Sequence, residues 1–435
     1  MRTARDKTLN GPFVISLLSL LFITACGREQ VATAQTDDWP SFRGPAGQGV
    51  SQSKVAPPVE FGDSKNIAWK TPLPGPGGSS PIVWSDRIYI TCWTGYNVPG
   101  ESGGSQEKLQ RHLIALRRDN GKEIWSVPIK ATLPEQDKIR EEHGYASSTP
   151  AADKAGVVCF FGKSGVYAFD HQGKQQWHAE VGSTIHGWGS AASPVLYSDL
   201  VIINASVESE SLIALNRKTG EKAWSVRGIK ESWNTPILVD VGGKKELIVA
   251  IMGKIFGITP ETGEQLWSCD TDIGWYMVPS LVAHEGVVYA LGGRSGVAGL
   301  AVRAGGKGDV TGSRRLWTSK KGSNVTSPIY SAGHLYWMHD NLGIAYCAKA
   351  ETGEIVYDKR IERAGQVYGS PVLANGLLYY PTREGRTYVI AARPEFELVA
   401  TNELERRGTF NGCPAVVDGK LLIRSDKFLY CMSSE

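Results

Sequence analysis

Side chains that could hold a ligand recur in short segments ahead of seven prolines. Each segment leads into a run of alternating apolar residues, so the same kind of loop is used repeatedly. Trp and Tyr rings can stack on a flat or sugar-like group, while Asn and His can fix its orientation. Alternatively, these groups line and plug a channel, bonding to one another and to water. The candidate ligand-binding residues are His143, Tyr145, His186, Trp188, Trp233, Asn234, Trp275, Tyr276, Asn324, Tyr368 and Asn411.

The reactive residue types do not assemble a catalytic site. His143 and His186 each precede a Gly and could share a transition metal, but no third ligand can be identified. His284-Glu285 lacks the second His, four residues on, of a zinc protease helix. No Gly-x-Ser-x-Gly elbow lies between a strand and a helix. The sequence therefore predicts no catalytic residue and no metal site, which favours a protein that is not an enzyme.

Residues 190–224 contain one complete unit of the pattern that must position these loops. Ser193-Pro194 opens the unit, apolar runs follow, and Thr219-Gly220 and Trp224 close it. Alternation with period two, rich in β-branched residues, predicts strands rather than helices. Gly220 can adopt the positive φ that tight turns often need. The unit is therefore predicted to be a four-stranded antiparallel meander.

This unit recurs with a period near 43 residues, the length of one propeller blade. A closing strand at residues 66–71 has nothing before it to close, while the last unit supplies only three strands. We therefore predict an all-β fold, an eight-bladed β-propeller of four-stranded antiparallel blades, whose ring is closed by the N-terminal strand pairing with the last blade. Such closure removes open sheet edges. The opening prolines are Pro81, Pro150, Pro194, Pro236, Pro279, Pro328, Pro371 and Pro414.

Three elements of the unit, Ala214-Leu215, Thr219-Gly220 and Trp224, resemble the repeat of pyrroloquinoline-quinone (PQQ)-type propellers. The resemblance covers nearly all of residues 60–434. It implies that the outer-strand Trp residues stack between blades as a structural girdle, with a small residue such as Ala214 leaving room for each indole. The seventh unit departs from the pattern, with Pro394 and Phe396 in place of Thr-Gly and Trp. The expected girdle residues are Trp69, Trp125, Trp177, Trp224, Trp267 and Trp317.

Two lineages of that family imply different functions. Quinoprotein alcohol dehydrogenases hold the quinone and calcium beside a disulfide between adjacent Cys residues and beside acidic residues. In this chain no two Cys are neighbours. Only Asp272, Glu231 and Glu141-Glu142 lie near the funnel, the face formed by the loops ahead of the opening prolines. The propeller lipoprotein of the outer-membrane barrel assembly machine is a non-catalytic scaffold, and the chain resembles it more in layout. We expect a non-catalytic exported propeller, without a cofactor, that binds a protein partner or small ligand at its funnel face. The alternatives are a PQQ- and calcium-dependent oxidoreductase and a scaffold for outer-membrane protein assembly.

The N-terminus has the features of an export signal. Positive charges precede an apolar run from Phe13 to Ile23, which is short for a membrane span. Ile23-Thr24-Ala25-Cys26 resembles a bacterial lipobox, and Gly27 resembles the outer-membrane sorting pattern; ordinary secretion with cleavage near residues 32–34 is the alternative. We expect a signal peptide at 1–26 with lipidation of Cys26, a linker and pre-ring segment at 27–60, and the propeller at 61–435. The protein would then be anchored at the periplasmic face of the outer membrane or at the cell surface.

Composition and charge exclude one class of partner. Lys and Arg number 47 and Asp and Glu 44, so the net charge is only +3, and the charges are scattered. Nucleic-acid binding needs a basic stripe that this chain lacks. Cys347 and Cys431 occupy a slot that Ala fills in other repeats, so we expect buried small hydrophobic residues and few or no disulfides. A monomeric ring is expected.

Three longer segments interrupt the regular repeat. Two insertions, at residues 93–111 and 127–146, should lie on the funnel face, which supports a binding site there. A third, at residues 303–313, should lie on the opposite face. The pre-ring segment Trp39–Gly49 is expected to pack on the ring itself, and the alternative is that it caps a partner site.

Overall fold

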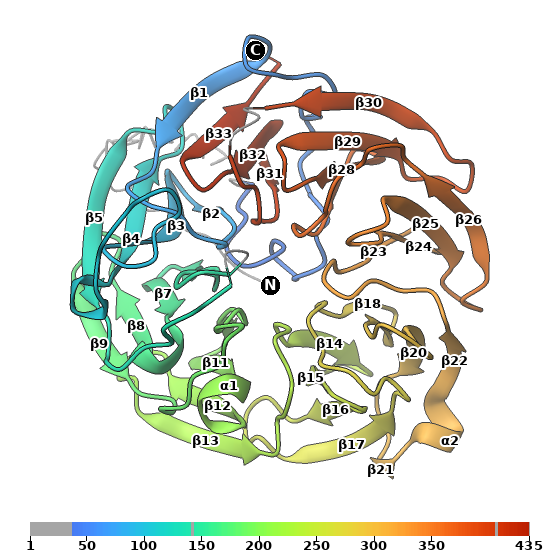
Figure 1. Ribbon diagram of the computed structural model, residues 1–435. Coiled ribbons are helices and arrows are strands. Elements are labelled where there is room, and N and C mark those ends of the chain that lie inside the picture. The colour runs from blue at the N-terminus through green and yellow to red at the C-terminus, as the bar shows by residue number, and fades with distance from the viewer. Residues whose placement is uncertain (1–36, 141–142, 405–407, 435) are drawn as a thin grey trace, which may run out of the picture. The chain divides into compact units, whose positions relative to one another are not determined.

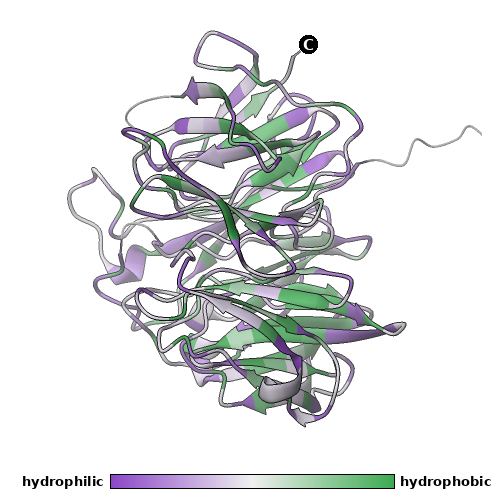
Figure 2. Ribbon diagram, turned by 90° about the vertical axis from the view of Figure 1, so that its right-hand side faces the viewer, coloured by the Kyte–Doolittle hydropathy of each residue, from purple (hydrophilic) through white to green (hydrophobic). Residues whose placement is uncertain are grey.

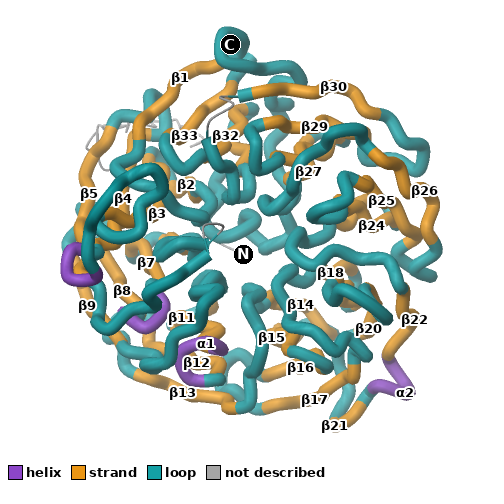
Figure 3. The backbone as a smooth tube through the Cα atoms, viewed as in Figure 1, coloured by secondary structure: helices purple, strands orange, loops and turns teal. Residues whose placement is uncertain are grey.

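The described strands form eight antiparallel sheets arranged as blades around a centre (Figure 1). The computed structural model describes residues 37–140, 143–404 and 408–434. The expected signal segment, Cys26 and Gly27 lie outside these residues. The predicted all-β, eight-bladed propeller is confirmed. The helices within this part are short (Figure 3): α1 (Ser206–Ser209), α2 (Thr311–Arg314), and the 3-10 turns η1 (Gln106–Lys108) and η2 (Gly162–Ser164).

Each blade runs from an innermost to an outermost strand. Blades one to four are β2 (Ile82–Trp84), β3 (Arg87–Thr94), β4 (Gln110–Arg117) and β5 (Glu123–Lys130); β6 (Ala151–Asp153), β7 (Gly156–Phe160), β8 (Val166–Phe169) and β9 (Gln175–Ala179); β10 (Val195–Tyr197), β11 (Leu200–Ala205), β12 (Ser211–Asn216) and β13 (Lys222–Arg227); β14 (Ile237–Val241), β15 (Lys244–Ile251), β16 (Lys254–Ile258) and β17 (Gln265–Asp270). Blades five to eight are β18 (Val282–His284), β19 (Val287–Leu291), β20 (Gly299–Arg303) and β22 (Arg315–Ser319); β23 (Ile329–Ser331), β24 (His334–Met338), β25 (Ile344–Lys349) and β26 (Ile355–Arg360); β27 (Val372–Ala374), β28 (Leu377–Pro381), β29 (Arg386–Ala391) and β30 (Leu398–Glu403); β31 (Ala415–Val417), β32 (Lys420–Arg424), β33 (Phe428–Met432) and β1 (Ile67–Pro72).

The first and last strands close the ring as predicted. β1 pairs with β33 in antiparallel register, with Trp69 opposite Cys431 and Thr71 opposite Leu429. The eighth blade therefore takes its outer strand from the other end of the described chain. None of the described helices is both long and apolar enough to cross a membrane. Apolar residues gather along the strands inside the blades, and polar residues gather in the connections (Figure 2).

The outer-strand tryptophans contact the neighbouring blade through a repeated geometry. Trp177 donates its indole N–H to the Arg217 carbonyl at 3.0 Å, and a Cβ added to Gly220 would lie 2.7 Å from its ring. Trp125, Trp224 and Trp317 likewise each donate to a carbonyl one blade on. Glycine is required at position 220 for two reasons: its φ is +76°, and a Cβ there would collide with the Trp177 ring.

The strand residue opposite each girdle ring is small. Ala115, Ala168 and Ala214 lie opposite their tryptophans, and Cys347 and Cys431 fill the same slot opposite Tyr357 and Trp69. Small residues here leave room for the indole. Within the described residues all six cysteines are buried and free, at Cys92, Cys159, Cys269, Cys347, Cys413 and Cys431.

Trp267 differs from the other girdle residues. Its indole N–H donates to the Glu246 carboxylate at 2.7 Å, and the short strand β21 (Gly308–Asp309) pairs alongside it as a parallel fifth strand of blade four. β21 belongs to the connection between β20 and β22. The insertion expected at residues 303–313 therefore covers the outer edge of the preceding blade.

A closed belt of hydrogen bonds links the eight blades around the centre. In each blade the backbone N–H of one residue donates to the side chain of the equivalent residue one blade on, at 2.9 to 3.1 Å. In blade five the belt residue is Ser280, which precedes Leu281, so Pro279 does not occupy the slot that proline fills elsewhere. We call these residues the belt: Ser80, Thr149, Ser193, Thr235, Ser280, Ser327, Ser370 and Cys413.

Residues 39–50, which we call the axial segment, pack on the ring, as expected for Trp39–Gly49. Trp39 forms a bridge with Val83 of β2, the Gln48 side chain accepts from the Ala283 N–H of β18, and Val50 bridges to Leu373 of β27. These strands are the innermost strands of blades one, five and seven. The segment therefore crosses the centre of the ring.

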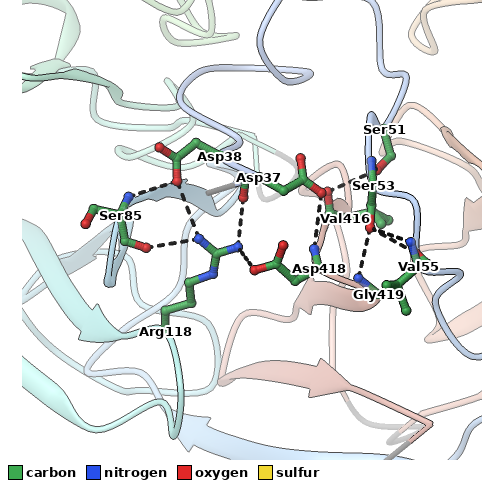
Figure 4. A network of polar contacts seen from close by, with 10 residues as sticks. All are labelled: Asp37, Asp38, Ser51, Ser53, Val55, Ser85, Arg118, Val416, Asp418 and Gly419. Carbon is green, nitrogen blue, oxygen red and sulfur yellow. Dashed lines mark hydrogen bonds and ion pairs between the residues drawn. The ribbon is translucent and has the colours of Figure 1, made fainter. Parts of the chain in front are cut away.

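Polar contacts hold the residues on either side of this segment against blades one and eight (Figure 4). Arg118 donates to the Asp37 carbonyl at 2.8 Å and forms ion pairs with Asp38 and Asp418. Beyond the other end, the Ser53 hydroxyl accepts from the Gly419 N–H at 3.1 Å. Because Asp418 and Gly419 connect β31 to β32, the segment is attached to the blade that closes the ring.

Candidate functional site

A cavity of about 240 Å³ lies on the funnel face, where the loops entering the innermost strands meet the loops between second and third strands. Its aromatic residues form one continuous chain of ring contacts. The rings of His143 and Trp188 are 5.7 Å apart, those of Trp188 and Tyr276 5.5 Å, and those of Tyr276 and Trp233 5.7 Å. His186 and Tyr368 extend the two ends of this chain. The structure thus brings these predicted residues together from blades two, three, four, five and seven.

A chain of polar side chains runs along blades five to eight of the same face. Asn324 and Arg294 both donate to the Tyr276 hydroxyl, at 3.4 and 3.1 Å. Asp340 accepts from the Asn324 backbone at 3.4 Å and from the Asn341 side chain at 2.6 Å. The chain continues through Gln366 and Arg383 to Asn411. The cavity therefore has an aromatic side and a hydrogen-bonding side.

Four of the eleven predicted residues do not line this cavity. Tyr145 is buried elsewhere, where its hydroxyl donates to the Gln136 carbonyl at 2.6 Å and burial raises its pKa to about 12. Asn234 is fully buried and donates to the Ala250 carbonyl at 2.6 Å, so it holds the backbone of blade four. Trp275 is exposed beside Arg294, and Asn411 lies at the far end of the polar chain.

Six polar or charged lining residues were not among the predicted ligand-binding ones: Arg140, Glu231, Arg294, Asp340, Asn341 and Gln366. Arg294, Asp340 and Asn341 follow the second strands of blades five and six. A polar residue two or three positions after the second strand is the signal that could have found them. Arg140 comes from the insertion at 127–146, and its guanidinium lies 4.3 Å from the centre of the Trp188 ring. That insertion contributes to the cavity, as expected.

A second cavity of about 480 Å³ continues from the first over blades five and six. The two share Arg294, Asn324, Asp340 and Asn341, and the second adds Lys320 and Lys321. Lys321 also lies 3.8 Å from Asp358. The lining residues of this second cavity include three cationic side chains and one carboxylate, so the cavity carries a net positive charge.

The lining residues do not match the donor set of a quinone and calcium site. Glu231 and Asp340 are the carboxylates among the described lining residues, and Asp340 already accepts hydrogen bonds from neighbouring residues. Asp272 instead pairs with Arg315 at 2.6 Å. The described part of the chain contains no group of three His, Cys, Asp or Glu side chains that could hold a metal. The arrangement is suited to stacking and hydrogen bonding.

Comparison with solved structures finds several propellers of the same fold. BamB from Moraxella catarrhalis is 13% identical, with a TM-score of 0.59, over 84% of this chain and 96% of that chain. A europium-containing methanol dehydrogenase is 13% identical, with a TM-score of 0.60, over 89% of each chain. A quinohemoprotein alcohol dehydrogenase from Pseudomonas putida HK5 is 12% identical, with a TM-score of 0.58, over 92% and 80%. At these identities the likeness shows the fold alone, which BamB and the dehydrogenases share.

Sequence comparison identifies the family. No curated protein sequence matches the chain. The family model described as outer membrane protein assembly factor BamB, built on PQQ-type repeats, matches residues 109–359, more than half of the 435 residues. The repeat, the ring closure and this match agree, and the chain therefore belongs to the BamB family of PQQ-like β-propellers.

Proposed function

We propose that this protein is a non-catalytic exported propeller whose funnel cavity binds a ring-bearing ligand, such as a sugar unit. The observation that carries the proposal is the cavity of about 240 Å³ between a continuous chain of aromatic rings and a chain of hydrogen-bonding side chains. Aromatic faces bind the apolar face of a ring, and fixed amides and carboxylates select its polar edge. No catalytic group and no cofactor are part of this proposal.

Trp188 provides the sharpest test because it lies in the middle of the aromatic chain. Trp188→Ala should weaken binding of an oligosaccharide roughly 10- to 100-fold, since one central aromatic anchor commonly contributes that much. Thermal stability should change little, because the Trp188 side chain is only half-buried. Titration calorimetry and tryptophan fluorescence with neutral and uronate-containing hexasaccharides would measure the loss.

Trp275→Ala is the matched control. Trp275 is on the same face and contacts the same Tyr276, but it is exposed and does not line the cavity. It should leave saccharide affinity within about twofold. Equal losses in both variants, or no binding of any hexasaccharide by the unaltered protein, would contradict a saccharide site in the funnel.

A second candidate function, a scaffold for outer-membrane protein assembly, is favoured by the family match over residues 109–359. A scaffold would bind a protein partner within a complex, and lipidation at Cys26 would hold it at the membrane. Affinity capture of the lipidated protein from its own membranes should then recover barrel-assembly proteins at a constant ratio. The Cys26→Ala variant should lose this recovery from membranes if the anchor is needed. Capture without any barrel-assembly protein would argue against the scaffold role.

A further inference from the structure

Arg43 places a guanidinium in the centre of the ring, with no carboxylate partner among the described residues. Its residue is 1% exposed, and its φ of +60° is a strained value for a non-glycine residue. One terminal nitrogen, Nη2, donates to the Pro328 carbonyl at 2.5 Å and to the Gln48 carbonyl at 3.1 Å. Nε and Nη1 have no hydrogen-bond partner among the described residues. Two donors of a buried cation are therefore unused.

The neighbouring backbone is shaped around this side chain. A Cβ added to Gly49 would lie 2.8 Å from Nη2 of Arg43, so only glycine fits there without movement. Gly49 also donates its N–H to the Arg43 carbonyl at 2.8 Å. A tight turn of the axial segment therefore holds the guanidinium, and the backbone around it fixes its position.

The belt supplies further donors beside Arg43. Pro328 directly follows Ser327 of the belt, and Cys413 of the belt acts electrostatically on Arg43. Every belt hydroxyl already accepts an N–H from the preceding blade. None of them donates to another described residue, so their hydroxyl protons remain available around the centre of the ring.

We infer that the centre of the ring is an anion site, in which an unpaired N–H of Arg43, on Nε or Nη1, and hydroxyl protons of the belt bind one small inorganic anion, with chloride as the best chemical match. A buried charge without a partner is costly, and a bound counter-ion removes that cost. The environment already disfavours the charged form, because burial lowers the pKa of Arg43 to about 10.

The chemistry of the donors selects the class of anion. All are N–H or O–H groups, and one cation requires a single negative charge for balance. A monatomic halide carries one charge and accepts from many directions, whereas a divalent oxyanion such as sulfate would need more space and a second positive charge. The anion would join the axial segment to the belt, so it would stabilise the packing of the axial segment across the centre of the ring.

Thermal unfolding in different sodium salts tests this inference on the full-length protein. At constant ionic strength, replacing methanesulfonate with chloride should raise the midpoint by roughly 2 to 4 °C and then saturate, as expected for a ligand that binds only the folded state. Arg43→Met should abolish the chloride-specific shift. Arg117→Met is the control, because Arg117 is an exposed arginine paired with Asp119 at 3.1 Å, and it should keep the shift.

Crystals grown in sodium bromide provide a second readout that does not require the variant to fold. An anomalous peak within hydrogen-bonding distance of Nε or Nη1 of Arg43 would support the site. The inference would be overturned by a chloride response that persists in Arg43→Met, by equal midpoints in chloride and methanesulfonate, or by bromide crystals with no anomalous peak beside Arg43. Water would then satisfy the guanidinium. None of these results depends on what the funnel cavity binds.

Discussion

Deleting residues 428–435 is expected to prevent the ring from folding. These residues include β33, which pairs with β32 on one side and with β1 on the other. Leu429, Tyr430, Cys431 and Met432 are each at most 1% exposed. Burial of four such side chains contributes on the order of 10 kcal/mol at about 1.5 to 3 kcal/mol each, which is comparable with the whole stability of a typical protein.

The deletion also exposes two strand edges, which favours aggregation. We expect the truncated protein to be insoluble, or to lack a cooperative thermal transition by circular dichroism. Deleting only residues 433–435 is the control, because it leaves β33 intact and should shift the midpoint by a few degrees at most. A soluble, cooperatively folding protein without β33 would show that the closing pair is dispensable.

Glu208→Gln is expected to remove a large part of the pH dependence of stability. Glu208 lies in α1 and is 2% exposed, and burial raises its pKa to about 7, opposed in part by a hydrogen bond from Ser190. Glu135, which pairs with Arg111 at 2.7 Å, adds a smaller upward effect on this pKa. The folded protein therefore holds a proton on Glu208 that the unfolded chain has already released.

The sign of the effect follows from this difference in proton binding. Between pH 4.5 and about 7 the folded state binds the extra proton, so the free energy of unfolding falls as the pH rises. A difference of this size corresponds to roughly 3 kcal/mol, fully present below pH 4.5 and lost above about pH 7. Glutamine keeps the neutral shape at every pH, so the variant should be the more stable protein at pH 8 and nearly equal at pH 4.

Urea unfolding of both proteins across this pH range would measure the effect. Glu210→Gln is the control, because Glu210 is exposed at the end of the same turn, 3.3 Å from Lys230, and its curve should run parallel to that of the unaltered protein. Parallel curves for Glu208→Gln as well would mean that Glu208 is charged in the folded state at neutral pH.

Much of the fold could be read from the chain because its markers act locally. Trp224, Gly220 and the alternating strands recur with one period, and each copy is a unit that needs a neighbour to bury its faces. An unclosed strand at one end and a missing strand at the other then imply a ring. The eighth blade of β31, β32, β33 and β1 confirms that inference.

The predicted funnel residues show the limit of what local sequence patterns can predict. His143, Trp188 and Tyr276 lie on the predicted face and meet in one cavity, yet Asn234, equally close to an opening proline, points into blade four and supports its backbone. Residues one position apart in an extended segment point in opposite directions, and the sequence alone does not show which one faces the axis.

The sequence by itself therefore determined the class of fold, the number of blades, the closing strand and the face on which the candidate binding residues gather, because these depend on periodicity within the chain. Only the tertiary structure revealed the belt, the position of Arg43 across the axis and the pairing of the aromatic chain with Asp340 and Arg294. Those features join residues from different blades. Their contacts depend on how far each loop reaches toward the centre, which no local pattern encodes.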